Sequence, residues 1–264
     1  MDLGATSLTS QQDQAFLAEG LRLIEKGQRR GVPLRLLGAV AVRLHCPTWR
    51  HLYEGMDRPI TDLDLMALGK HNVAVQDLLG SQGYVADQDV MRFFGSHRHI
   101  YEHPDRPGLK VDIFFGALRF CHVVDFTRRL EIDYPTVSLA DLVLEKMQIV
   151  EINAKDLKDT LVLLCEHAPS ETEKPEHVNL GYLCSVLGND WGYYHTVTTN
   201  LVKTREYLAE MTVFGPEPRR IVSERLDEIL QALKAAPKTL KWRLREKVGT
   251  KAKWYTDVEE VYRP

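Results

Sequence analysis

The stretch Arg58-Pro59-Ile60-Thr61-Asp62-Leu63-Asp64-Leu65 carries two aspartates two positions apart within an alternating pattern of apolar and polar residues. This alternation continues to Leu68 and predicts a β-strand over residues 61–68. On a strand, residues i and i+2 leave the same face, with Cα atoms roughly 6.6 Å apart. The pattern therefore predicts that the carboxylates of Asp62 and Asp64 lie side by side.

Two neighbouring carboxylates suggest a metal site. Like charges this close disfavour joint ionisation unless a cation lies between them. Mg²⁺ prefers oxygen ligands and usually completes its octahedron with waters and substrate phosphates. We therefore expect Asp62 and Asp64 to bind Mg²⁺ or Mn²⁺. The alternative is an exposed strand face that carries two aspartates by chance, because Asp-x-Asp sequences are common.

A third acid strengthens the metal interpretation. Asp112 lies in Lys110-Val111-Asp112-Ile113-Phe114-Phe115, where it interrupts an otherwise apolar predicted strand. Burying a carboxylate without a partner costs free energy. Asp112 is therefore expected to join Asp62 and Asp64 as the third catalytic and metal-binding residue.

A glycine turn precedes the two aspartates in the chain. Residues 34–37 predict a short strand, Gly38 closes it, and residues 39–45 predict a helix that ends before Pro47. Glycine permits close backbone approach, and the free N–H groups of a first helical turn attract phosphate. Gly38 and Ala39 are therefore candidates for binding a triphosphate, although glycine is also the ordinary way to turn a chain after a strand.

The remaining pattern predicts an α/β (α+β) protein with a mixed sheet and a helical C-terminal part. Residues 10–30 and 71–82 predict helices, and two strands over 92–103 and 109–115 predict a hairpin. From Ser138 onward the periodicity is helical, with a start that resembles a capping box. We place the boundary near Pro135, so that the domains would span residues 1–135 and 136–264.

Composition excludes several classes of protein. The formal net charge of -3 excludes a chain that is basic throughout, although a local basic surface remains open. The four cysteines form no Cys-x-x-Cys pair, so the sequence signals neither a zinc site nor a disulfide framework. The start of the chain is polar, and no stretch approaches the ~20 apolar residues of a membrane helix. We expect a cytoplasmic protein that does not contact a membrane.

The order of these motifs resembles a known superfamily. Leu37-Gly38-Ala39-Val40-Ala41, the 58–65 stretch and Val111-Asp112-Ile113 are similar to the polymerase-beta-type nucleotidyltransferases, closest to the AbiEii-like group, over roughly residues 34–160. The resemblance implies the nucleotidyltransferase fold and transfer of a nucleoside monophosphate from a nucleoside triphosphate to a hydroxyl group. It also implies that Arg58 and Thr61 belong to the nucleotide-binding strand and loop.

The resemblance leaves the acceptor open. RNA ends, small hydroxylated molecules and proteins are all acceptors in such proteins, and a toxin-like member would have an antitoxin-type protein partner. Ala39 stands where serine is common in the family. This departure leaves a non-catalytic nucleotide-binding or regulatory module on the same fold as the alternative function.

Lys146 interrupts the apolar face of the helix predicted from Ser138. Either its stem packs while the ammonium reaches solvent, or its charge points into a cleft between domains. The resemblance matches Lys146 and the run Lys155-Asp156-Leu157-Lys158-Asp159, and it implies that Lys146 and Asp159 contact the nucleotide. Asp156 also fits a helix cap with Asn153, and we expect Asp159 to lie off the apolar face of its helix.

Three further clusters have a structural and a functional interpretation each. The 238–253 stretch carries seven Lys and Arg and a single acid, Glu246, which is typical of a solvated face or of an RNA-binding surface.

The aromatic residues in 190–195 either stack a base or pack helices together, and we favour packing. His97, His99 and His103 alternate as metal ligands on a strand do, but no acid or cysteine accompanies them at ligand spacing, so no metal is expected there.

Overall fold

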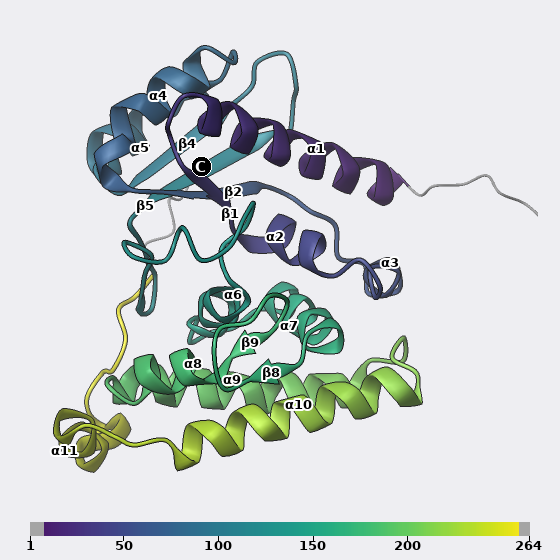
Figure 1. Ribbon diagram of the computed structural model, residues 1–264, viewed down its shortest axis with the longest axis vertical. Coiled ribbons are helices and arrows are strands. Elements are labelled where there is room, and N and C mark those ends of the chain that lie inside the picture. Colours follow the sequence, from purple (N-terminus) through teal and green to yellow (C-terminus); the bar gives the residue numbers. More distant parts are fainter. Residues whose placement is uncertain (1–7, 259–264) are drawn as a thin grey trace, which may run out of the picture. The chain divides into compact units, whose positions relative to one another are not determined.

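The computed structural model describes residues 8–258, and residues 1–7 and 259–264, which include the first part of the polar N-terminal stretch, lie outside the described residues. The contacts between Cα atoms divide the chain into two compact units (Figure 1). The described residues of the first unit are 8–44, 57–118 and 125–137, and those of the second are 45–56, 119–124 and 138–258. The units therefore interleave along the chain, whereas the sequence-based division places a single cut after residue 135.

A five-stranded mixed sheet forms the centre of the first unit, in the order β1-β2-β5-β4-β3. Its strands are β1 (Leu34–Leu36), β2 (Leu63–Ala67), β3 (Val85–Ala86), β4 (Arg98–Glu102) and β5 (Lys110–Phe115). β2 and β5 are parallel, and the other neighbouring strands are antiparallel. β2 and β5 are buried along nearly their whole length, as is typical of parallel strands, whose two faces are usually covered.

Helices cover this sheet. In the first unit they are α1 (Leu8–Arg29), α2 (Gly38–His45, whose last residue belongs to the second unit), α4 (Asn72–Gly80), α5 (Gln88–Phe94) and the 3-10 turn η1 (Gly69–His71). The α1 helix packs closely on β1 and β2, because a Cβ at Gly20 would lie 2.8 Å from Leu36 and 3.0 Å from Leu63. The strand, glycine turn and helix expected at residues 34–45 are confirmed.

The predicted hairpin is confirmed, but its first strand is shorter than expected. β4 and β5 pair antiparallel, yet β4 begins at Arg98 and not at residue 92. The preceding residues form α5, because the side chain of Asp87 caps that helix and accepts hydrogen bonds from the backbone N–H groups of Asp89 and Val90. A local cap therefore overrides the extended pattern that the sequence suggests.

The second unit is mainly helical, which confirms the predicted class of the C-terminal part. Its helices are α3 (Leu52–Gly55), α6 (Leu139–Met147), α7 (Ala154–Glu166), α8 (Leu180–Leu187), α9 (Trp191–Glu210), α10 (Pro216–Ala235), α11 (Leu240–Val248) and the 3-10 turn η2 (Gly249–Lys251). The short strands β8 (Pro169–Ser170) and β9 (Val178–Asn179) pair in parallel, and β6 (Ala117–Arg119) and β7 (Val123–Asp125) lie where the chain passes between units. Within residues 8–258, no helix has the length and apolar character needed to cross a bilayer.

Both helix starts predicted for this region are present. Ser138 precedes α6, and its hydroxyl accepts a hydrogen bond from the backbone N–H of Asp141 at 3.4 Å and donates one to the Asp141 carboxylate at 2.8 Å. Asn153 caps α7 by accepting from the N–H of Asp156 at 3.0 Å. Each cap satisfies a backbone donor that a helix leaves open at its first turn.

Candidate active site

Asp64 and Asp112 are direct neighbours across the parallel pair β2 and β5. Residues in register on adjacent strands lie about 4.8 Å apart and leave the same face of the sheet. Asp112 is buried, with 4% of its surface exposed, and Asp64 is half-buried. Asp62, which stands just before β2, is also half-buried and accepts a hydrogen bond from the hydroxyl of Thr61 at 3.3 Å.

Gly38 brings the start of α2 against Asp64. Its φ is +61°, and a Cβ at this position would overlap the Oδ2 atom of Asp64, so glycine is required both by the backbone and by the close approach. The backbone N–H of Leu37 donates to the Asp64 carbonyl oxygen at 2.9 Å and ties the turn to β2. Ala39 is buried, so the start of this helix offers phosphate only its backbone N–H groups.

Arg98 is the principal partner of Asp112, and sequence reasoning missed it. From β4, its Nε lies 3.0 Å from Oδ1 and 3.2 Å from Oδ2 of Asp112, and its Nη2 lies 2.5 Å from Oδ2. Such a forked ion pair is among the strong hydrogen-bonded contacts available to a carboxylate. The register of β4 on β5 places Arg98 opposite Phe114, two residues from Asp112, and this register is not visible in the sequence alone.

The electrostatics connect all three acids. Burial raises the pKa of Asp112, the neighbouring charge of Asp62 raises it further, and Arg98 only partly offsets these effects. Burial acts to lower the pKa of Arg98, but the hydrogen bonds and charge of Asp112 and the charges of Asp64 and Asp62 raise it overall. The Arg98 guanidinium therefore interacts electrostatically with all three carboxylates.

These residues fit a hard divalent cation by their chemistry. The donor set consists of carboxylate oxygens, which Mg²⁺ and Mn²⁺ prefer, and Arg98 already stands beside Asp112 as a cation. Among residues 8–258, the three carboxylates do not form a group whose ligand atoms all lie within 4.8 Å of one another. With the Arg98 guanidinium on Asp112, a metal would have to compete with Arg98 for this carboxylate.

Arg58 supports the loop that leads to Asp62. It is buried, with 5% of its surface exposed, and its Nη1 donates to the Pro59 carbonyl oxygen at 2.6 Å. Its own carbonyl oxygen accepts from Arg43, whose Nε in turn lies 3.1 Å from the carboxylate of Asp13. These contacts favour orientation of the loop as the role of Arg58 over direct binding of phosphate.

In the second unit, Lys146 and Asp159 contact each other. The Nζ atom of Lys146 lies 3.2 Å from Asp159, 3.0 Å from Asp156 and 3.8 Å from Glu145. Only 8% of the Lys146 side chain is exposed, so of the two alternatives the one in which its ammonium reaches solvent is wrong. Asp159 was expected off the apolar face of its helix, yet it is fully buried, because packing of α6 on α7 gives its charge a lysine partner.

The histidines near β4 and the aromatic cluster have structural roles. His99 is fully buried, and its ring nitrogens lie 2.9 Å from the Gly95 carbonyl oxygen and 3.0 Å from the Tyr101 hydroxyl. In the aromatic cluster, the Tyr193 hydroxyl donates to the Leu144 carbonyl oxygen at 2.7 Å. The ring of Trp191 stacks on His195 with centroids 5.0 Å apart, which supports the packing interpretation.

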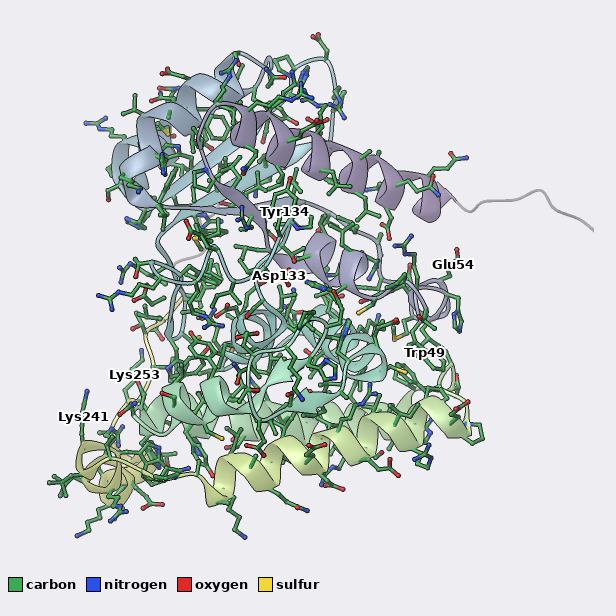
Figure 2. All side chains as sticks on the ribbon, viewed as in Figure 1. Trp49, Glu54, Asp133, Tyr134, Lys241 and Lys253 are labelled. Carbon is green, nitrogen blue, oxygen red and sulfur yellow. The ribbon has the colours of Figure 1, made fainter. Side chains whose placement is uncertain are left out.

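The basic residues of the C-terminal stretch differ in their contacts. Lys238 and Arg245 bind main-chain carbonyl oxygens close to them in the chain, so they stabilise local structure. Lys253, which is labelled in Figure 2, forms an ion pair with Asp257. Lys241, Arg243 and Lys247 are exposed on α11. The exposed set is therefore the part of this stretch that suits contact with a polyanion.

No family model and no curated protein sequence matches this chain. Two solved structures are similar to it. One is an antigenic nucleotidyltransferase-like protein from Paracoccidioides brasiliensis, 15% identical, with a TM-score of 0.41 over 86% of this chain and 95% of that chain. The other is the antibiotic-resistance factor ANT(2'')-Ia, 12% identical, with a TM-score of 0.35 over 91% of this chain and 100% of that chain. Similarity at this level does not assign the chain to a family or an activity.

Proposed function

We propose that the chain is a metal-dependent nucleotidyltransferase that transfers a nucleoside monophosphate from a nucleoside triphosphate to a hydroxyl acceptor. The observation that carries the proposal is the pairing of Asp64 with Asp112 in register beside the Gly38 turn, where a helix begins. Acids on one sheet face supply metal ligands, and the adjacent helix start supplies N–H groups for phosphate. The resemblance of the three motifs to AbiEii-like nucleotidyltransferases points to the same chemistry.

In this reaction the acceptor hydroxyl would lose its proton to Asp112, its oxygen forms a bond to the α-phosphorus, and the bond from that phosphorus to the leaving pyrophosphate breaks. Asp62, Asp64 and Asp112 would hold Mg²⁺ or Mn²⁺, which when bound neutralises charge on the phosphate oxygens. The backbone N–H groups at Gly38 and Ala39 would bind the phosphates. Arg58 and Thr61 would hold the loop and the first acid in place.

Arg98 adds a step that sequence reasoning did not anticipate. Its guanidinium binds Asp112, and guanidinium groups bind phosphate with the same forked geometry. Asp112 would hold the metal together with Asp62 and Asp64, and Arg98 beside it would bind a phosphate oxygen of the nucleotide. The resemblance also supports Lys146 and Asp159 as nucleotide-binding residues. Because these two side chains form an ion pair with each other, nucleotide binding would have to break or rearrange that pair.

The decisive experiment measures transfer directly. Purified protein is incubated with each labelled triphosphate, Mg²⁺ or Mn²⁺ and total RNA, alongside Asp64→Asn and the matched variant Asp77→Asn, which changes an exposed aspartate on α4. We expect labelled product from the wild type and from Asp77→Asn, and none from Asp64→Asn. Equal product from Asp64→Asn would exclude this enzymatic function.

A second candidate function is a non-catalytic nucleotide-binding or regulatory module. Two observations favour this module. Ala39 is buried and lacks the serine hydroxyl common in the family, and Arg98 forms an ion pair with the Asp112 carboxylate that a metal would need. This module would bind a triphosphate in the presence of Mg²⁺ without releasing pyrophosphate. Measuring nucleotide binding and pyrophosphate release on the same preparation separates the two functions.

An RNA end is the acceptor that the exposed cations of α11 support. Replacing Lys241, Arg243 and Lys247 with glutamine should lower the slope of log affinity for single-stranded RNA against log salt by about 0.7 for each phosphate that the variant no longer neutralises. Replacing Arg29, Arg30 and Lys70, which are exposed in the first unit, changes net charge equally and serves as the control. Unchanged RNA binding by the α11 variant would favour a small-molecule or protein acceptor. A toxin-like function would in addition require an antitoxin-type partner.

A further inference from the structure

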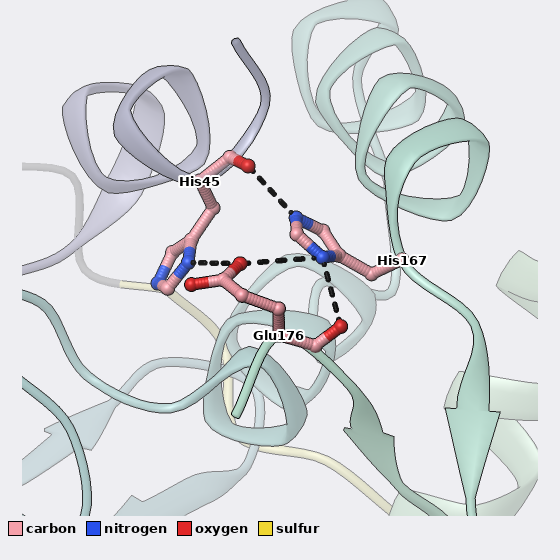
Figure 3. A group of neighbouring side chains, drawn as sticks. All are labelled: His45, His167 and Glu176. Atoms are coloured by element: carbon pink, nitrogen blue, oxygen red, sulfur yellow. Dashed lines mark hydrogen bonds and ion pairs between the residues drawn. The ribbon is translucent and has the colours of Figure 1, made fainter. Parts of the chain in front are cut away.

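Two histidines and a glutamate meet in the second unit (Figure 3). His45 is the last residue of α2, His167 directly follows α7, and Glu176 lies between β8 and β9. One carboxylate oxygen, Oε2 of Glu176, lies 3.2 Å from Nδ1 of His45 and 3.3 Å from Nδ1 of His167. One potential ligand atom from each residue lies within 4.8 Å of the other two.

Burial gives this cluster a closed side and an open side. His45 and His167 are buried, with 8% and 4% of their surfaces exposed. The side chain of Glu176 is 59% exposed, so the cluster is accessible from solvent through the glutamate. Glu176 also has a φ of +55°, a left-handed conformation that is uncommon for residues other than glycine and that its position in this loop demands.

Both ring nitrogens of His167 lie next to oxygen atoms of the protein. Its Nε2 lies 2.9 Å from the His45 carbonyl oxygen, and its Nδ1 lies 3.1 Å from the Glu176 carbonyl oxygen as well as near the Glu176 carboxylate. A neutral imidazole carries one N–H, so one ring nitrogen must direct a lone pair at oxygen whichever tautomer is present.

We propose that His45, His167 and Glu176 bind a divalent transition-metal ion of the zinc class. A cation converts the unfavourable contact between the Nδ1 lone pair and oxygen into coordination. Two histidine nitrogens and one carboxylate form a known zinc donor set, with a water in the fourth position. Ligands about 2.1 Å from a tetrahedral ion lie roughly 3.4 Å apart, which matches the two nitrogen-to-oxygen distances in the cluster.

The surroundings of His167 also suit a metal ligand. With Nδ1 directed at the ion, Nε2 donates its N–H to the His45 carbonyl oxygen, and this kind of contact orients metal-bound histidines. The ion would connect segments 131 and 122 residues apart in sequence, because His45 lies that far from Glu176 and from His167. Nitrogen donors make this site selective for zinc-class ions, whereas Asp62, Asp64 and Asp112 offer oxygen only.

The test uses the full-length protein without a histidine tag, stripped of metal and titrated with Zn²⁺ against a chromogenic chelator in excess Mg²⁺. We expect one tightly bound Zn²⁺ per chain, and a visible d–d absorption band characteristic of a tetrahedral site when Co²⁺ replaces it. Glu176→Gln and Glu176→Ala, which change an exposed side chain, should each weaken binding by about tenfold or more. Asp64→Asn should bind Zn²⁺ as the wild type does.

Three results would overturn the metal site. The first is the absence of stoichiometric Zn²⁺ binding, and the second is equal Zn²⁺ affinity in the wild type and both Glu176 variants. The third is loss of binding in Asp64→Asn, which would assign the ion to the acids. Circular dichroism and melting of the metal-free variants check that each one folds. Because the assay follows Zn²⁺ binding, its outcome does not depend on whether the chain transfers nucleotides.

Discussion

Glu19 and Asp112 are two buried carboxylates of the first unit, and each binds an arginine through two nitrogens. Glu19 accepts from Arg22 at 2.9 and 2.5 Å, from Arg106 at 2.9 Å and from the Tyr84 hydroxyl at 2.6 Å. Asp112 has its forked contact with Arg98. Both residues have 4% of their surface exposed, so burial alone does not distinguish them.

Their pKa values shift in opposite directions. Burial alone would raise the pKa of Glu19, but the hydrogen bonds from Arg22, Tyr84 and Arg106 outweigh it and lower the pKa to about 2. Burial raises the pKa of Asp112 more than Arg98 and Lys110 lower it, and the charge of Asp62 adds to the increase. Glu19 is therefore a structural contact in which three donors outweigh burial, whereas at Asp112 burial outweighs the neighbouring cations. Such an imbalance is typical of functional sites.

The largest effect should come from Asp112→Asn. We expect the proposed transfer activity to fall on the order of 10²-fold or more, because a metal ion supplies several kcal/mol of charge stabilisation. The free energy of unfolding should change by less than about 1 kcal/mol, because burial already disfavours the charged form of Asp112. In addition, Arg98 would still interact with the charges of Asp62 and Asp64 in this variant. Initial rates and urea unfolding of the same preparation measure both. A large loss of stability with unchanged activity would make Asp112 a structural residue like Glu19.

Arg98→Gln should change how the protein responds to metal. Removing a charged hydrogen-bond donor from Asp112 should cost about 2 kcal/mol in metal-free protein. Mg²⁺ should then raise the melting temperature more than in the wild type, because Arg98 no longer competes for the carboxylate. Lys70→Gln, which removes an exposed cation, is the control. Equal Mg²⁺-induced shifts in all three proteins would contradict the competition between Arg98 and metal.

Glu19→Gln should lower stability in a manner that depends on pH. The folded pKa of Glu19 is lowered, so its stabilisation is present above the ordinary value of 4.5 and is lost as pH falls toward about 2. The whole shift corresponds to about 3 kcal/mol, and solvent screening of the part-exposed Arg22 and Arg106 reduces this to about 2 kcal/mol at pH 7. Urea unfolding from pH 7 down to pH 3 measures the difference. A constant difference across this range would exclude the ionised Glu19 as its source.

Tyr84→Phe should have the smallest effect. It removes one of the donors to Glu19 while keeping the ring, so we expect a loss of about 1 kcal/mol and a higher pKa for Glu19. An NMR titration of the Glu19 carboxyl group reports the pKa directly. If this pKa does not move, the arginines alone account for the difference between Glu19 and Asp112.

Local patterns in the sequence were sufficient for the strand, the turn and the helix starts. The alternation around Asp64 and the capping residues Ser138 and Asn153 act over a few positions, so their structural consequences are readable without a fold. The turn at Gly38 is readable in the same way, whereas its positive φ and its close approach to Asp64 are known only from the structure. The assignment of Asp62, Asp64 and Asp112 to one metal site stays a prediction that the transfer experiment tests.

Contacts between distant residues were decided by the tertiary structure. Arg98 reaches Asp112 through the register of a hairpin, and Lys146 is buried against Asp159 by the packing of two helices. Neither register nor helix packing is set by the residue types alone, because both depend on how whole elements fit together.

The sequence by itself determined the mixed α/β class, the order of the glycine turn and the acids, and the main helix starts. Only the tertiary structure decided which charges have partners, including the convergence of His45, His167 and Glu176. The physical reason is range. Propensity, capping and alternation operate between near neighbours in the chain, whereas burial and electrostatic balance depend on residues that folding brings together, from 14 positions apart for Arg98 and Asp112 to 131 for His45 and Glu176.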